Sequence, residues 1–148
     1  DYNGRRMGRK GNGACRRQNY RYCPTSRMSN TYIANGKSTP EEIIAATKLG
    51  LYAVGFNGGS VDPATGEFNF GCSEAYIIRD GKVCEPVKGA TLIGKGEEIL
   101  KKIDMVGNDL NLGQGMCGAS SGSIRTNVGQ PTIRISEITV GGRGGELK

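Results

Sequence analysis

Apolar and polar residues alternate in short stretches along most of the chain, and turn signals separate these stretches. Alternation of this kind is typical of half-buried β-strands. It predicts successive strands at 27–33, 52–56, 60–62, 67–70, 74–79, 82–85 and 89–93. Two turn sequences, Asp62-Pro-Ala-Thr-Gly66 and Asp80-Gly81, predict that neighbouring strands form antiparallel hairpins. A final strand is expected over 131–140, with a bulge near Ser136-Glu137 that keeps its four large aliphatic residues on one face.

Two other segments have helical spacing. Thr39 and Glu42 form a capping-box pattern at the start of a helix over 40–49, and Gly50 is expected to end it in a left-handed conformation. A second helix is expected from about Gly96 to Val106. The pattern as a whole predicts an α+β fold, an antiparallel β-rich domain with about two short helices and Gly-rich loops.

Composition adds two features to this prediction. Glycine is unusually frequent, at 25 of 148 residues, which favours turns and irregular loops. Positive charge is concentrated at the start, because residues 1–27 hold eight Arg or Lys and one acid, Asp1. We expect this segment to be mostly irregular coil. Its basic residues and tyrosines are compatible with phosphate contacts, but no nucleic-acid-binding motif accompanies them, and nucleic acid is not the expected partner.

Cysteine and histidine counts exclude several kinds of site. The five cysteines are an odd number without a C-x-x-C pair, which favours free thiols in the cytoplasm over a secreted disulfide framework. No histidine is present, so this chain alone cannot build a Ser-His or Cys-His catalytic pair or a histidine-ligated zinc site. No apolar run is long enough to span a membrane, and no membrane partner is expected.

One cysteine stands apart from the others. Cys117 follows a predicted helix and lies among Gly113, Gly115, Gly118 and Gly122, which are expected to form a loop with positive φ angles. A thiolate in such a loop can ligate zinc or attack a substrate. From the loop alone, a buried free cysteine is the simpler interpretation.

Seven short stretches together resemble one family, the TldD/PmbA metallopeptidases, also called modulators of DNA gyrase. They occur in the family's order over nearly the whole chain, closer to TldD than to PmbA: Arg27-Met-Ser-Asn-Thr-Tyr-Ile33, Gly36-Lys-Ser-Thr-Pro-Glu-Glu-Ile43, Ser73-Glu-Ala-Tyr-Ile77, Pro86-Val-Lys-Gly-Ala-Thr-Leu-Ile-Gly94, Met105-Val-Gly-Asn-Asp-Leu110, Cys117-Gly and Val128-Gly-Gln-Pro-Thr132. The resemblance covers only the C-terminal part of a family member, so residues 1–148 are expected to be the C-terminal portion of such a peptidase.

The resemblance implies a zinc site that this chain completes only in part. Family members bind zinc with an H-E-x-x-x-H helix and a downstream cysteine, and Cys117 matches that cysteine. The helix, with the glutamate that acts as base, would precede Asp1. The resemblance therefore implies Zn²⁺ in the full-length protein, no tightly bound zinc in this chain alone, and no catalytic base within it.

The family also implies the partners. These are a small or unfolded peptide substrate and a homo-oligomer or a TldD–PmbA-type hetero-oligomer. Arg27, Asn30 and Thr31 are expected to border the substrate cleft, where a strand edge can pair with an extended peptide. The alternative is a non-catalytic binding module that contacts gyrase or nucleic acid through its basic segment.

Overall fold

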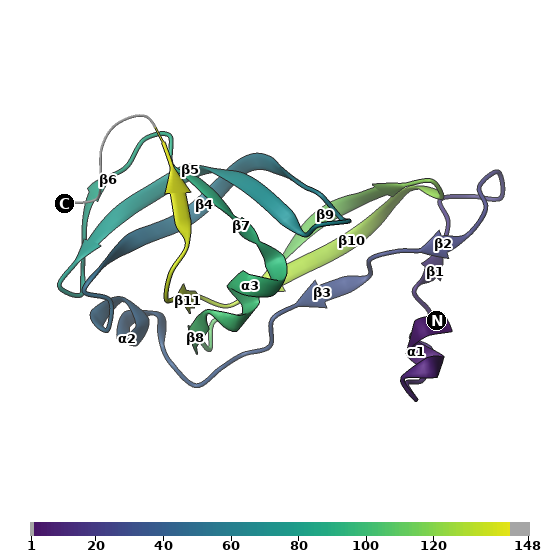
Figure 1. Cartoon of the computed structure of the whole chain (residues 1–148), viewed down its shortest axis with the longest axis horizontal. Coiled ribbons are helices and arrows are strands. Elements are labelled where there is room, and N and C mark those ends of the chain that lie inside the picture. Colours follow the sequence, from purple (N-terminus) through teal and green to yellow (C-terminus); the bar gives the residue numbers. More distant parts are fainter. Residues whose placement is uncertain (1, 143–148) are drawn as a thin grey trace. The chain divides into compact units, whose positions relative to one another are not determined.

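We describe a computed structural model of the chain, which covers residues 2–142. The chain divides into two compact units, each built from two segments (Figure 1). Unit 1 comprises Asp1–Ala34 and Leu110–Pro131, and unit 2 comprises Asn35–Asp109 and Thr132–Lys148. Among residues 2–142, none of the helices has the length and apolar character needed to cross a membrane.

Unit 1 is built around a long β-hairpin. Strand β10 pairs antiparallel with β9 and parallel with β3, which gives the order β3-β10-β9. A helix and a two-stranded ribbon precede this sheet. The elements of unit 1 are α1 (Tyr2–Arg6), β1 (Cys15–Arg16), β2 (Thr25–Ser26), β3 (Asn30–Tyr32), β9 (Asn111–Ala119) and β10 (Gly122–Gln130).

The start of unit 1 is more ordered than its sequence suggests. Residues 1–27 were expected to be mostly coil, but they contain α1 and the β1–β2 ribbon. The strand expected at 27–33 is reduced to β3, because the backbone N–H of Arg27 donates to the carbonyl of Ala14 and thereby continues the ribbon (2.8 Å). These strand boundaries depend on pairing between segments that are distant in sequence. The local pattern of apolar and polar residues contains no information about such pairing.

Unit 2 is a twisted antiparallel sheet with the order β12-β7-β5-β4, and β6 also pairs with β5. A second, two-stranded sheet joins β11 to β8. The elements are α2 (Pro40–Ala45), β4 (Leu49–Val61), β5 (Glu67–Arg79), β6 (Lys82–Pro86), β7 (Thr91–Lys95), α3 (Gly96–Lys101), β8 (Ile103–Val106), β11 (Ile133–Ile135) and β12 (Thr139–Gly141). The predicted α+β, antiparallel-rich class is confirmed.

Both predicted hairpins of unit 2 are present. The turn at residues 62–66 joins β4 to β5. The Asp80-Gly81 pair joins β5 to β6, and both residues have positive φ, 47° and 75°, as the tightest hairpin turns require. The capping box is also confirmed: the Thr39 side chain accepts from the Glu42 N–H, and the Glu42 carboxylate accepts from the Thr39 N–H.

Three boundaries in unit 2 differ from the sequence prediction. Helix α2 ends at Ala45, and Gly50 lies inside β4 instead of ending a helix over 40–49. The helix expected to reach Val106 stops at Lys101, because β8 follows at once and pairs with β11. The last strand is divided into β11 and β12, which join different sheets. In each case, pairing with a strand that is distant in sequence sets the boundary, and the spacing of apolar residues within the segment does not.

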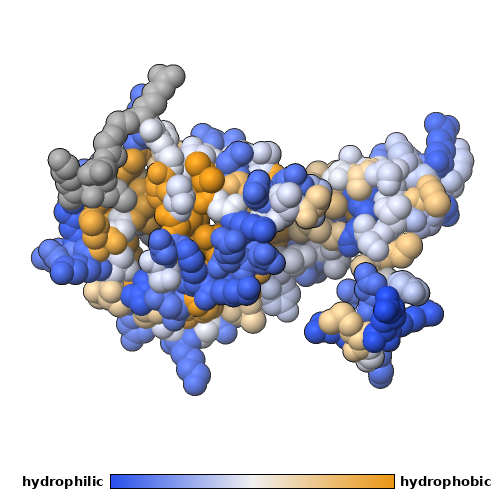
Figure 2. Space-filling model, viewed as in Figure 1, coloured by the Kyte–Doolittle hydropathy of each residue, from blue (hydrophilic) through white to orange (hydrophobic). Residues whose placement is uncertain are grey.

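Unit 2 buries a small core and leaves much apolar surface open. Cys72, Ala75 and Ala90 form the buried cluster, with Leu51 and Leu92 packed against it. Figure 2 shows apolar side chains uncovered over this unit in the face in view. The exposed large residues of unit 2 include Leu49, Val54, Phe56, Val61, Val83, Ile93, Leu100 and Val140. Such surface is typical of a part that packs against other protein.

One ion pair in unit 2 yields a stability prediction. The Arg134 guanidinium donates to both carboxylate oxygens of Asp104 (2.9 Å each) and to the Ala46 carbonyl (3.0 Å). The hydrogen bond from Arg134 lowers the pKa of Asp104. We expect Asp104→Asn to reduce the free energy of unfolding by about 1 kcal/mol at pH 7, a small value because both side chains are partly exposed.

The pH dependence of this effect has a definite sign. Because the pKa of Asp104 is lowered in the folded state, its contribution is full above the unfolded pKa of about 3.9 and is lost as the pH falls through the folded value. Urea unfolding at pH 7 and near pH 2 measures the difference, which should vanish in acid. Glu137→Gln is the control, since the Glu137 side chain is 81% exposed in its pair with Lys102. An equal loss in both variants would contradict the prediction.

Candidate functional site

Cys117 lies in strand β9 of unit 1 and not in the glycine-rich loop expected from the sequence. It pairs with Ile124 of β10. Of the glycines around it, only Gly122 has a positive φ, 92°. The flanking glycines therefore form part of an extended strand, and the turn that reverses the chain comes after Cys117. Its side chain is half-buried.

The buried guanidinium of Arg27 organises the surroundings of Cys117. Arg27 is 6% exposed. Its Nη1 donates to the Ser121 hydroxyl and to the Gly122 carbonyl (2.7 Å each), and its Nη2 donates to the Cys117 carbonyl. Ser121, which is fully buried, also accepts from the Thr25 hydroxyl (2.9 Å). These bonds attach the segment before β3 to the turn between β9 and β10.

Two arginines favour the ionised form of the Cys117 thiol. A hydrogen bond from the Arg27 side chain, followed by one from the Met28 main chain and by the charges of Arg27 and Arg16, lowers the pKa of Cys117. Arg16 is held nearby by bonds to the carbonyls of Met28 (2.9 Å) and Arg125 (3.2 Å). A thiolate is the form of cysteine that ligates a metal or acts as a nucleophile.

Charge distribution in unit 1 reinforces this conclusion. Residues 2–34 and 110–131 contain no Asp or Glu, so Arg27 is a buried cation without a carboxylate partner in the described part of its own unit. In addition, its Nε is buried and has no hydrogen-bond partner within residues 2–142. Buried charges are costly unless an opposite charge accompanies them. An anionic sulfur at Cys117 would supply that charge.

The register of the sheet separates the other predicted site residues. Thr31 pairs with Val128 and Cys117 with Ile124, so Thr31 and Cys117 lie on one face. Asn30 is on the opposite face of β3. Both residues are exposed, whereas the Arg27 guanidinium is engaged by its own chain. A role for Arg27, Asn30 and Thr31 in substrate binding stays a prediction.

Asn30 borders a shallow polar hollow of ≈ 650 Å³ on that opposite face. The side chains that line it come from all three strands of the β3-β10-β9 sheet, and the register brings them onto one side. They are Asn30, Gln114, Met116, Arg125 and Asn127, with Gly115 and Thr126 completing the lining.

Sequence reasoning missed Arg16 and Ser121. Arg16 was counted only as part of the basic segment, and no role was expected for Ser121. No local signal identifies either residue, because each has a partner about 100 residues away in sequence: Arg16 donates to the Arg125 carbonyl, and Ser121 accepts from Thr25.

The remaining cysteines have different surroundings. Cys15, Cys23 and Cys84 are exposed. Cys72 is buried in the core of unit 2, and burial raises the pKa of its thiol. Cys117 is therefore the cysteine best prepared to be a thiolate.

The described residues supply only part of a metal site. Within residues 2–142 no group of three or more His, Cys, Asp or Glu side chains is arranged to hold one. Cys117 fits the role of a single soft ligand, since its neighbours favour the thiolate and residues 2–34 and 110–131 contain no carboxylate side chain that competes for them.

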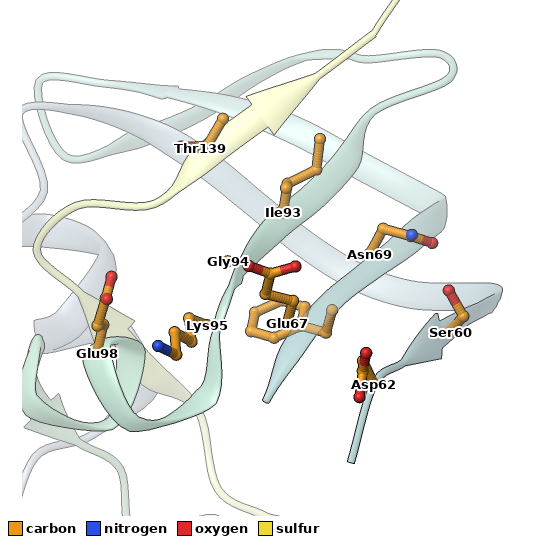
Figure 3. A pocket seen from close by; sticks show the side chains of 10 residues that line it. Ser60, Asp62, Glu67, Asn69, Ile93, Gly94, Lys95, Glu98 and Thr139 are labelled. Atoms are coloured by element: carbon orange, nitrogen blue, oxygen red, sulfur yellow. The ribbon is translucent and has the colours of Figure 1, made fainter. Parts of the chain in front are cut away.

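A second hollow, of ≈ 580 Å³, lies in unit 2 between β4, β5, β7, α3 and β12 (Figure 3). Three of its lining residues are acidic, Asp62, Glu67 and Glu98. The Asp62 carboxylate already accepts the N–H groups of Ala64 and Thr65 in the β4–β5 turn (2.7 and 3.3 Å). None of the predicted site residues lines this hollow, and we assign it no function.

One family model matches most of the chain. Residues 1–142 match the family model described as "PmbA/TldA metallopeptidase C-terminal domain". A protein of Haemophilus influenzae named "Metalloprotease TldD homolog" is 49% identical over 142 residues, which are 95% of this chain and 30% of that protein. A "Metalloprotease" of Methanothermobacter thermautotrophicus is 43% identical over 119 residues, 80% of this chain and 26% of that protein.

Solved structures agree on the fold. The crystal structure of TldE from Thermococcus kodakarensis superposes with a TM-score of 0.74 and 22% identity over 96% of this chain and 30% of that one. The chain thus spans less than a third of the length of the curated relatives it matches.

Proposed function

Since this chain belongs to the TldD/PmbA metallopeptidase family, we propose that it forms part of a zinc-dependent peptidase, to which it supplies the Cys117 thiolate as one zinc ligand and part of the substrate cleft. The observation that carries the proposal is the pairing of Cys117 with Arg27 and Arg16, which lowers the pKa of the thiol in a unit without described acids. An H-E-x-x-x-H helix outside the described residues would supply the other ligands and the base.

The chemistry follows from the ligand set. Zinc held by three protein ligands keeps one position for water, whose pKa it lowers toward about 7. Within this chain, Cys117 would hold the ion, and Arg27 fixes the strand that carries Cys117 by donating to its carbonyl. The Arg16 guanidinium is held in place by donating to the main-chain carbonyls of Met28 and Arg125.

The substrate proposed is a small or unfolded peptide. Strand β3 pairs with β10 on one side, and within residues 2–142 no strand pairs with its other edge. An extended peptide can add to such an edge through main-chain hydrogen bonds, independently of its sequence. Thr31 is the residue of β3 that shares a face of the sheet with Cys117, and we expect it to contact a peptide bound along that face.

Oligomerisation and location belong to the same proposal. The apolar surface that unit 2 leaves open supports packing against the rest of a longer chain or against a second subunit, either a copy or a PmbA-type partner. Five free thiols support a cytoplasmic setting.

A comparison of zinc content tests the proposal. After dialysis, we expect the full-length protein to retain about one zinc per chain and to cleave an unstructured peptide. Residues 1–148 alone should retain less than about a tenth of this amount of zinc and should not cleave the peptide, because a single thiolate ligand does not hold zinc tightly. Elemental analysis and a fluorogenic peptide assay measure both. One tightly held zinc in the isolated chain, or none in the full-length protein, would contradict the ligand assignment.

A further inference from the structure

The hollow on the Asn30 face of unit 1 has no role in the proposed zinc site. The side chains that project from this face are those of Asn30, Gln114, Met116, Arg125 and Asn127, whereas Cys117 projects from the opposite face. A strand exposes alternate residues on its two sides, so one sheet separates the hollow from the metal ligand. The hollow is therefore a candidate second site.

The hydrogen-bonding groups of the hollow are unused. Arg125, Asn30, Gln114 and Asn127 make no side-chain hydrogen bond or ion pair within the described part of the chain. The described part of unit 1 offers Arg125 no carboxylate side chain either, because residues 2–34 and 110–131 contain no Asp or Glu. The same two segments carry nine Arg or Lys. A guanidinium without a carboxylate partner, in the positive electrostatic field of these residues, attracts an anion.

The lining also indicates what kind of anion fits. Small-molecule pockets are mostly apolar, but three amides line this one, and an amide side chain can donate to and accept from a peptide group. Arg125 can hold a carboxylate through two parallel hydrogen bonds. Met116, which is 64% exposed, adds an apolar contact.

The spacing suits an extended ligand. Arg125 and Asn127 are two residues apart on β10, and Gln114 and Met116 are two apart on β9. Residues separated in this way stand about 7 Å from each other on a strand, which is also the separation of alternate side chains in an extended peptide. A peptide lying on this face can thus place one acidic side chain on Arg125 while the amides bind its main chain.

We propose that this hollow is an exosite that binds acidic, extended segments of peptide substrates through Arg125. The proposal rests on the peptidase function proposed above and adds to it a preference for substrates with Asp or Glu away from the cleaved bond. Binding at the exosite does not involve Cys117, so the two sites can be tested separately.

The test uses the zinc-loaded full-length protein and a pair of labelled unstructured peptides that differ only by three Glu in one and three Gln in the other. We expect higher kcat/KM and tighter binding by fluorescence anisotropy for the Glu peptide. Arg125→Gln should reduce the Glu-to-Gln ratio of both quantities at least about five-fold. Arg21→Gln is the matched control, because Arg21 is an exposed arginine of the same unit outside the hollow; it should preserve the ratio.

Each alternative has its own signature. Equal ratios for Arg125→Gln and wild type, or an equal change in Arg21→Gln, would overturn the exosite. So would stoichiometric displacement of the peptide by a single-stranded oligonucleotide, or a change in sedimentation coefficient of Arg125→Gln that indicates a subunit contact. Cys117→Ala separates the two proposals: cleavage should stop while Arg125-dependent binding of the Glu peptide continues. If wild type cleaves neither peptide but binds the Glu peptide through Arg125, the exosite stands and the peptidase function fails.

Discussion

Replacing Cys117 by alanine in the full-length protein should remove most of the zinc and nearly all peptidase activity. The substitution takes away one of three proposed protein ligands, and the loss of even a residue that only supports a ligand typically costs 10–100-fold in metal affinity or activity. We expect a loss of at least about 100-fold in kcat/KM. Cys117→Ser keeps the size but offers a harder oxygen, so it should retain some zinc at high metal concentration and remain almost inactive.

The fold should survive this change. Cys117 is half-buried, and it pairs with Ile124 through the main-chain ladder of β9 and β10, which alanine retains. Cys15→Ala, Cys23→Ala and Cys84→Ala are matched controls, because these thiols are exposed and should not affect metal content. Cys72→Ala is a weaker control, since Cys72 lies in the core of unit 2. Full zinc and activity in Cys117→Ala would return Cys117 to the role of a half-buried structural residue.

Local chemistry allowed much of unit 2 to be predicted from the sequence. The Asp80-Gly81 turn and the Thr39–Glu42 capping box involve neighbours in sequence, and both are present. Predictions failed where partners are distant. The helix expected to run to Val106 stops at Lys101, because Ile103–Val106 pairs with Ile133–Ile135. A hydrophobic spacing that suits a helix also suits a short strand once a partner is available.

In the candidate site, too, features that depend on distant partners could not be predicted from the sequence. The importance of Cys117 came from a family resemblance, since glycines around a cysteine indicate only a site of close approach. Its placement in a strand, with Arg27 bonded to its carbonyl, depends on a contact between residues 90 positions apart. Asn30 and Thr31 face opposite ways because they are neighbours on a strand. Which of them shares a face with Cys117 could not be obtained from their sequence, because the pairing of β3 with β10 and of β10 with β9 sets it.

The second large effect concerns Arg27. Arg27→Met should raise the pKa of the Cys117 thiol toward its ordinary value of about 8.5, because the hydrogen bond and the charge that favour the thiolate are removed together. The variant should also lose about 3 kcal/mol of stability, since the buried Ser121 hydroxyl and the carbonyls of Gly122 and Cys117 lose their donor. Methionine is chosen because it fills most of the vacated volume without a charge.

Two measurements on the metal-free full-length protein separate the electrostatic effect from the structural one. The rate of Cys117 alkylation, followed by peptide mass spectrometry from pH 5 to pH 10, reports the thiol pKa, and its midpoint should move upward in Arg27→Met. Urea unfolding reports the stability.

Arg27→Lys keeps the charge but not the forked hydrogen bonds. Its alkylation midpoint should therefore lie between those of wild type and Arg27→Met, while much of the stability is still lost. Arg21→Met, at an exposed position of the same unit, should change neither quantity. An unchanged midpoint in a stably folded Arg27→Met protein would show that Arg27 does not prepare Cys117 for metal binding, and Arg16 would then be the next residue to replace.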